Sequence, residues 1–122
     1  MKRALINRNL IVLLPKQPAL DWILRVDPEP MTYLTLDAFR QEQDAFLIPE
    51  GKVETPEAAQ RWAERRWDAI FTQFLFSWFM DESMWPERRT LGMFRQWFEV
   101  QYHSMVWDVS GDPIVHDDWE EV

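Results

Sequence analysis

The sequence contains no cysteine and only three glycines among its 122 residues. Without cysteine the chain has no disulfide, no thiolate metal ligand and no cysteine nucleophile, and this composition favours a reducing compartment. Three glycines are too few for a glycine-rich phosphate loop, and no serine-hydrolase, zinc-protease or dinucleotide motif occurs. The longest apolar segment, residues 70–80, falls short of the roughly 20 residues that span a bilayer. We therefore predict a cytoplasmic protein with no cofactor, no metal and no membrane contact.

Basic residues are also scarce, since 13 Lys and Arg stand against 21 Asp and Glu and the net charge is -8. This sign opposes binding to nucleic acid through its phosphates. The acidity is uneven: residues 1–20 hold four bases and no acid, whereas residues 108–122 hold six acids and no base. Without those last fifteen residues the chain has 13 bases and 15 acids. Most of the net charge therefore belongs to the C-terminal segment.

Aromatic residues are abundant, with eight Trp and eight Phe in a chain that is 47% hydrophobic. Such a chain has enough apolar surface to fold, and its length fits one domain. We predict a single α+β domain over residues 1–109 and an acidic tail over residues 110–122. Aromatic side chains beyond the needs of a small core are typical of interfaces, so a homodimer through residues 70–80 is one interpretation.

Hydrophobic patterning predicts the elements of the first half. Residues 5–14 are rich in Ile, Leu and Val and indicate a central strand covered on both faces, because residues 10–14 are apolar without alternation. Pro18 opens a short helix, and Thr35 is the expected N-cap of another that reaches about Gln43. Residues 45–48 then indicate a second strand.

Three further elements are predicted in the second half. Thr55 and Pro56 begin one long helix, in which apolar residues recur at offsets of three and four as far as Trp78. Thr90 caps a helix that reaches about Gln101. Residues 102–109 indicate a third strand. The sum is an α+β fold: a small sheet of about three strands packed with one long and several short helices.

Two arginines that precede a predicted helix suggest an anion site. Free backbone N–H groups at a helix start and two guanidinium groups attract a carboxylate or phosphate. His103 is a candidate base for the same site. The candidate residues are Trp85, Arg88, Arg89, Thr90 and His103. In the alternative interpretation the arginines neutralise nearby acids, Trp85 fills the core under a turn, and His103 bonds across a helix-to-strand junction.

The C-terminal tail places one large aromatic residue among four acids. This composition suits a short segment that docks its ring in a partner's groove under electrostatic guidance. The candidate partner-binding residues are Asp117, Asp118, Trp119, Glu120 and Glu121. A frayed terminus, or Trp119 folded back on its own domain, is the alternative. His116 next to two acids has metal-binding atoms but no second anchored ligand, so no metal site is predicted.

The chain resembles a set of small uncharacterised bacterial proteins, over most of residues 9–109. The residues that carry the resemblance are Asn9-Leu10, Pro15-Lys16-Gln17-Pro18, Asp21-Trp22, Phe46-Leu47-Ile48-Pro49-Glu50, Trp85-Pro86, Arg89-Thr90, Phe94, Trp97-Phe98, His103-Ser104-Met105-Val106 and Asp108. Some members of that set carry a lipoprotein label, which does not suit a chain without cysteine. The resemblance implies a bacterial domain and transfers no catalytic residue.

Three functions remain open on these grounds. We favour a non-enzymatic interaction protein that engages a protein partner through aromatic surface and the acidic tail. The first alternative is a small ligand-binding or enzymatic domain that uses Arg88, Arg89 and His103. The second is mimicry of nucleic acid by the nine acids of residues 21–60, which requires carboxylates spaced like phosphates on one face.

Overall fold

A computed structural model describes residues 2–29 and 33–119 of the chain. Its main sheet is antiparallel in the order β3-β2-β4, and β2 (Arg8–Pro15) lies between β3 (Asp44–Pro49) and β4 (Phe98–His103). A second sheet pairs the short strands β1 (Ala4–Leu5) and β5 (Trp107–Asp108). The predicted α+β class, with a three-stranded main sheet, is confirmed.

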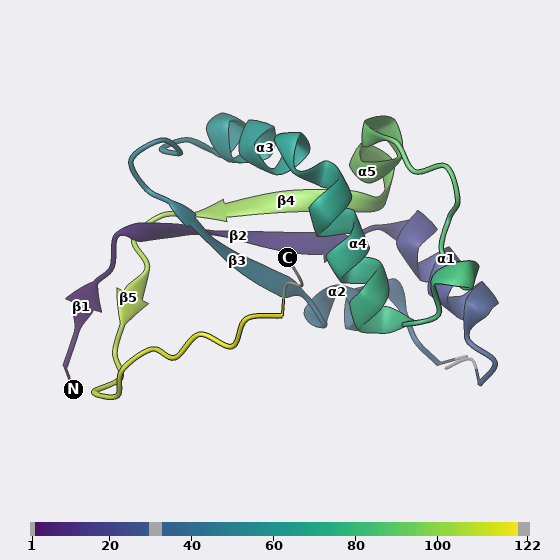
Figure 1. Cartoon of the computed structure of the whole chain (residues 1–122), viewed down its shortest axis with the longest axis horizontal. Helices are drawn as coiled ribbons and strands as arrows, with labels where there is room; N and C mark the ends of the chain where they lie inside the picture. Colours follow the sequence, from purple (N-terminus) through teal and green to yellow (C-terminus); the bar gives the residue numbers. More distant parts are fainter. Residues whose placement is uncertain (1, 30–32, 120–122) are drawn as a thin grey trace.

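The helices lie on one face and at one end of the main sheet. Helix α4 (Trp67–Trp78) lies in front of the strands, and α3 (Pro56–Arg65) lies above β4 (Figure 1). The other elements gather at the end of the sheet away from β1 and β5. They are α1 (Gln17–Val26), α2 (Leu36–Gln41), the 3-10 turn η1 (Glu82–Met84) and α5 (Leu91–Trp97).

Strand β2 is buried on both faces, as a central strand should be. Ile11 and Leu13 point into the main core, and Val12 and Leu14 of the opposite face are also buried. The residues that flank Val12 on that second face, in the neighbouring strands, are exposed. The prediction of a central strand is therefore correct, but the helices cover the sheet on one side.

The core is a cluster of aromatic rings. Phe71 is fully buried, and its ring centroid lies 5.1 Å from the centroids of both Trp97 and Phe98. The rings of Phe39 and Phe74 meet edge to face at 6.0 Å. Such offset and edge-to-face pairs are the favoured aromatic geometries. Much of the aromatic content therefore lies in the core. It includes the buried residues of segment 70–80, for which the sequence suggests a dimer interface.

The predicted long helix is two helices, so that prediction is wrong. Arg66 has φ -117° and ψ 22°, and its backbone N–H bonds to the carbonyls of Ala63 and Glu64. This single non-helical residue separates α3 from α4. Helix α3 lies along the upper edge of the sheet, whereas α4 crosses the strands (Figure 1). Because α3 and α4 pack in different directions, the helix has to break between them, although the sequence has neither Pro nor Gly there to indicate a break.

The last predicted helix and strand have different boundaries in the structure. Helix α5 ends at Trp97, and β4 begins at Phe98 because residues 98–103 alternate between inward and exposed positions and pair with β2. Met105 then takes a left-handed backbone conformation with φ 62°, which interrupts the strand predicted over residues 102–109. The chain resumes as β5, which pairs with β1 in the smaller sheet.

The three predicted threonine caps are confirmed. The hydroxyl oxygens of Thr35, Thr55 and Thr90 accept hydrogen bonds of 3.1, 3.0 and 3.1 Å from backbone N–H groups three residues later. Helix α4, with 12 residues, is the longest in the described part of the chain. None of the helices described there combines the length and apolarity that crossing a membrane requires.

Candidate functional site

The structure places the two candidate anion-binding arginines differently. Arg89 turns inward: one guanidinium nitrogen donates to the carbonyl of Pro86 at 2.9 Å, and another lies 3.6 Å from Asp68. Its guanidinium carbon is 6.0 Å from the rings of Phe71 and Trp85, which is itself buried. Arg88 is exposed. Arg89 therefore ties the loop before α5 to the core.

His103 lies at the other end of β4 from these arginines. It ends the strand and is paired with Leu10, whereas α5 leads directly into the strand's first residue, Phe98. Five residue steps along a strand cover roughly 17 Å. Trp85, Arg89 and Thr90 have structural partners, and His103 does not share a cleft with them. The geometry gives no support to a joint anion site.

The tail leaves the domain as an exposed extended segment. Residues 109–119 form no helix or strand, and all of them are exposed. The side-chain hydrogen bonds found there are local, such as that from the Trp119 indole N–H to Asp117 at 3.1 Å. Trp119 flanks a shallow hollow beside Phe76 of α4, yet 75% of its surface is exposed. Glu120 and Glu121 lie outside the described residues.

The acids of residues 21–60 are spread over several elements. They lie on α1, α2, β3, the start of α3 and the loops between them. Two already have local partners: Asp21 accepts from Gln17 at 2.8 Å, and Asp27 accepts from the backbone of Glu29 at 2.9 Å. These acids therefore belong to no single helix or strand, and two of them are hydrogen-bonded within the chain, which does not favour mimicry of nucleic acid.

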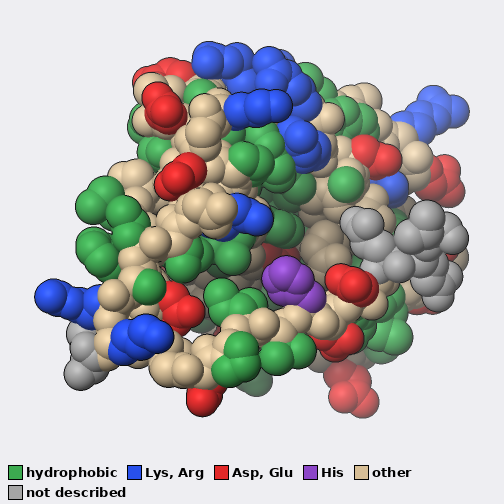
Figure 2. All heavy atoms as spheres, turned by 60° about the vertical axis from the view of Figure 1, so that its left-hand side comes forward, with side chains coloured by type: hydrophobic (Ala, Val, Ile, Leu, Met, Phe, Trp, Pro, Cys, Tyr) green, Lys and Arg blue, Asp and Glu red, His purple; other side chains and the backbone are tan. Residues whose placement is uncertain are grey.

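A groove that the sequence does not predict runs beside the free edge of β3. We define the β3 groove as three adjoining hollows, of which the first two share Asp44 and the last two share Trp62 and Arg66. One side is β3 and the other is formed by α3 and α4. Figure 2 shows the hollowed face, with Lys and Arg side chains gathered above it over α3. The middle of the groove is lined by Ala45, Phe46, Trp62, Ala69, Ile70 and Gln73.

One end of the groove is basic. Its lining includes Lys52, Arg61, Arg65 and Arg66 and no acidic residue. The Arg66 guanidinium lies 3.9 Å from the ring centre of Trp62 and donates to the Trp62 carbonyl at 3.2 Å. A cation above an indole at this distance is held by about 0.5–1 kcal/mol at an exposed site. Arg66 therefore occupies a defined place in the groove.

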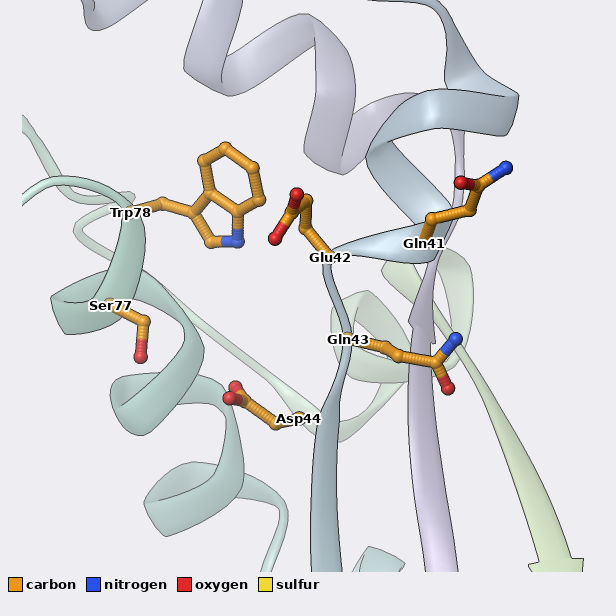
Figure 3. Close-up of a pocket in the computed structure, with 6 residues that line it drawn as sticks. All are labelled: Gln41, Glu42, Gln43, Asp44, Ser77 and Trp78. Carbon is orange, nitrogen blue, oxygen red and sulfur yellow. The ribbon is translucent and has the colours of Figure 1, made fainter.

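The other end of the groove is acidic. Figure 3 shows the carboxylates of Glu42 and Asp44 directed toward α4, whereas Gln41 and Gln43 point away from it. Burial raises the pKa of the Asp44 carboxyl above its ordinary value. Within the part of the chain that the structure describes, the Asp44 side chain has no hydrogen-bond or ion-pair partner.

A buried polar network holds the loop at the basic end. Asn9 is 7% exposed, and its side-chain amide donates to the Val53 carbonyl at 2.7 Å and to the Tyr102 hydroxyl at 2.8 Å. The Tyr102 hydroxyl also donates to the Val53 carbonyl, at 3.2 Å. A buried amide with satisfied bonds fixes its neighbours in one arrangement. The loop that carries Lys52 is therefore anchored to the sheet through Val53.

The sequence contained one signal of the basic end. Arg61, Arg65 and Arg66 near Trp62 suggest contact with an acidic partner, but neighbouring acids on the same helix suggested a self-neutralised surface. The structure pairs those acids elsewhere: Glu64 with Arg95 at 2.8 Å and Asp68 with Arg89 at 3.6 Å. None of the three ion pairs among the described residues includes a cation of the β3 groove.

Comparisons with protein-family models, with curated proteins and with solved structures find no match to this chain. The resemblance to small bacterial proteins therefore stays a prediction. The groove and the tail, as the structure describes them, are the basis for a functional proposal.

Proposed function

We propose that this chain is a non-enzymatic interaction protein that engages a protein partner through its acidic C-terminal tail. The observation that carries the proposal is the exposure of apolar side chains in an acidic segment whose one hydrogen bond to the domain, among the described residues, lies at its start, from the Ser110 N–H to Asp108 at 2.9 Å. Ile114, Val115 and Trp119 are 62, 83 and 75% exposed.

The contrast with the rest of the molecule supports this reading of the tail. Most large aromatic residues of the domain pack into one core, whereas Trp119 is 75% exposed, compared with 51% for Trp107 in β5. An extended segment with apolar anchors and surrounding charge is a common ligand of protein grooves. The proposal keeps the cytoplasmic location that the cysteine-free composition favours.

Cross-linking from the tail tests the proposal. A photoreactive phenylalanine analogue replaces Trp119 in the otherwise complete chain, and a matched probe replaces Trp107, which is 51% exposed in β5. We expect one protein to be cross-linked from position 119 in cells, and to be lost when Asp117→Lys and Asp118→Lys are added. Purified, that protein should bind the complete chain and lose at least about tenfold in affinity for the double variant.

The probe at position 107 separates docking from random collision. Identical cross-linked proteins from both positions, unaffected by the tail charges, would contradict the proposal. A cross-linked protein that binds the chain lacking residues 110–122 as tightly as the complete chain would also contradict it.

A further inference from the structure

The β3 groove has the form of a site for an extended segment. Among residues 2–29 and 33–119, strand β3 pairs with β2 alone, so its other edge carries backbone N–H and C=O groups that no strand of this range pairs. An added segment satisfies these groups and places alternate side chains on the two faces of the sheet. One face of β3 presents half-buried Phe46 to the groove, and the other presents Leu47, which is 50% exposed. Both faces of β3 therefore have apolar surface for an added strand to cover.

The charges along the groove select both a ligand and its direction. Four cations stand where β3 ends, around Pro49, and two carboxylates stand where it begins, around Asp44. A segment with apolar residues followed by acids matches this order when it runs parallel to β3. The reverse direction brings acids to Glu42 and Asp44, where like charges repel at short range.

The tail has this pattern. Ile114 and Val115 are β-branched residues that favour an extended chain, and Asp117 and Asp118 follow them. In an extended segment Val115, Asp117 and Trp119 share one side and Ile114 lies on the other. With the first side toward the helices, Val115 lies over the apolar middle of the groove and Asp117 meets its arginines. Ile114 then lies beside Leu47.

The tail of the same chain does not run in this direction. It leaves β5 on the side of the sheet where β3 ends and runs toward α4, opposite to β3 (Figure 1). Trp119 accordingly lies beside Gln73 and Phe76 of α4, away from Lys52 and Arg61. Trp119 therefore adjoins Ala69 and Gln73 from the middle of the groove, at the end of a segment that runs opposite to the direction that the groove charges favour. A tail from another molecule is free of this restriction.

We propose that the tail of one copy, residues 114–119, binds in the β3 groove of a second copy as a strand parallel to β3. The evidence is the open edge of β3, the groove cations, which form no ion pair with any described residue, and the matching order of apolar and acidic residues in the tail. The inference rests on the proposed function, because it names what the tail binds. It predicts a dimer or larger assembly that weakens as salt screens the charges.

Reversal of charges tests this assignment in the complete chain. The groove variant carries Arg61→Glu and Arg65→Glu, and the tail variant carries Asp117→Lys and Asp118→Lys. Each variant alone should lose self-association by about tenfold or more, because its groove and tail then repel. An equimolar mixture of the two should recover it, since each groove again meets a tail of opposite charge. Sedimentation velocity and native mass measurement give the dissociation constants.

Matched controls keep the outcome interpretable. Arg25→Glu with Arg88→Glu reverses two exposed arginines outside the groove and should leave self-association unchanged. Circular dichroism checks that every variant is folded, and Arg61→Gln with Arg65→Gln replaces the groove variant if it is not. A wild-type chain that is monomeric throughout, a dimer that survives deletion of residues 110–122, or a mixture that stays monomeric would overturn the inference. A monomeric chain whose Trp119 still cross-links another protein leaves the proposed function standing.

Discussion

Glu64 shows how single residues at this surface are held by partners from other elements. Arg95 of α5 donates from two guanidinium nitrogens to the two oxygens of the Glu64 carboxylate, at 3.0 and 2.8 Å. Gln60 donates to the same carboxylate at 2.9 Å. These hydrogen bonds, from Arg95 foremost, lower the pKa of Glu64 from 4.5 to about 2. Glu64 thus joins α3 to α5. Its carboxylate is therefore paired with Arg95 and not with Arg61 or Arg65 of its own helix.

We expect the stability of the folded chain to depend on this pair in a pH-dependent way. Because the folded chain releases the Glu64 proton more readily than the unfolded chain, the pair stabilises the fold above about pH 4.5 and loses this effect as the pH falls toward about 2. Arg95→Gln should therefore lower the free energy of unfolding at pH 7 by about 0.5–1 kcal/mol, the range of exposed ion pairs. Urea unfolding between neutral and acidic pH measures the difference, which should shrink in acid. Arg25→Gln is the control, and a pH-independent difference would contradict the prediction.

At the scale of elements, local sequence predicts helix starts well and other boundaries poorly. A threonine cap needs only a hydroxyl and a backbone N–H three residues later, so Thr35, Thr55 and Thr90 could be identified without tertiary information. The break at Arg66 has no comparable local cause, because it follows from the different packing of α3 and α4. The change from α5 to β4 at Phe98 likewise depends on pairing with β2.

The cap of α3 offers a test at this scale. Thr55→Ala removes the oxygen that accepts the Ala58 N–H, and we expect a loss of about 1 kcal/mol in the free energy of unfolding. For a domain of this size that loss lowers Tm by roughly 3–6 °C. Thr55→Ser retains the acceptor and should keep Tm close to that of the unchanged chain. Equal melting temperatures for the two variants would show that the cap contributes little.

At the scale of the whole molecule, the fold separates a buried aromatic core from an exposed acidic tail. Rings from α1, α2, α4, α5 and β4 meet in this core, which joins segments far apart in the sequence. The described tail residues add no buried side chain to it. The domain and the tail therefore differ in that the domain residues form the core, whereas the described tail residues are all exposed.

Deletion of residues 110–122 should accordingly leave the fold intact. We expect the free energy of unfolding to change by no more than about 0.5 kcal/mol, because the described tail residues are exposed and hydrogen-bond only locally. Thermal unfolding under conditions where the protein is monomeric measures this change. Phe71→Ala, which empties a fully buried site, serves as the destabilising control and should cost about 3–5 kcal/mol. A comparable loss on deletion of the tail would mean that the tail stabilises the domain.

The sequence by itself determined the α+β class, the central position of β2, the threonine caps and the concentration of acid in the tail. Each of these depends on local chemistry: apolar patterning, a hydroxyl at a helix start, or the order of charges along the chain. Only the tertiary structure decided where α3 gives way to α4, that Arg89 turns inward away from His103, and that an open groove follows β3. These features depend on contacts between distant segments. Above all, the charge of the basic surface depends on Glu64 and Asp68 pairing with arginines far along the chain, which neighbours in sequence do not reveal.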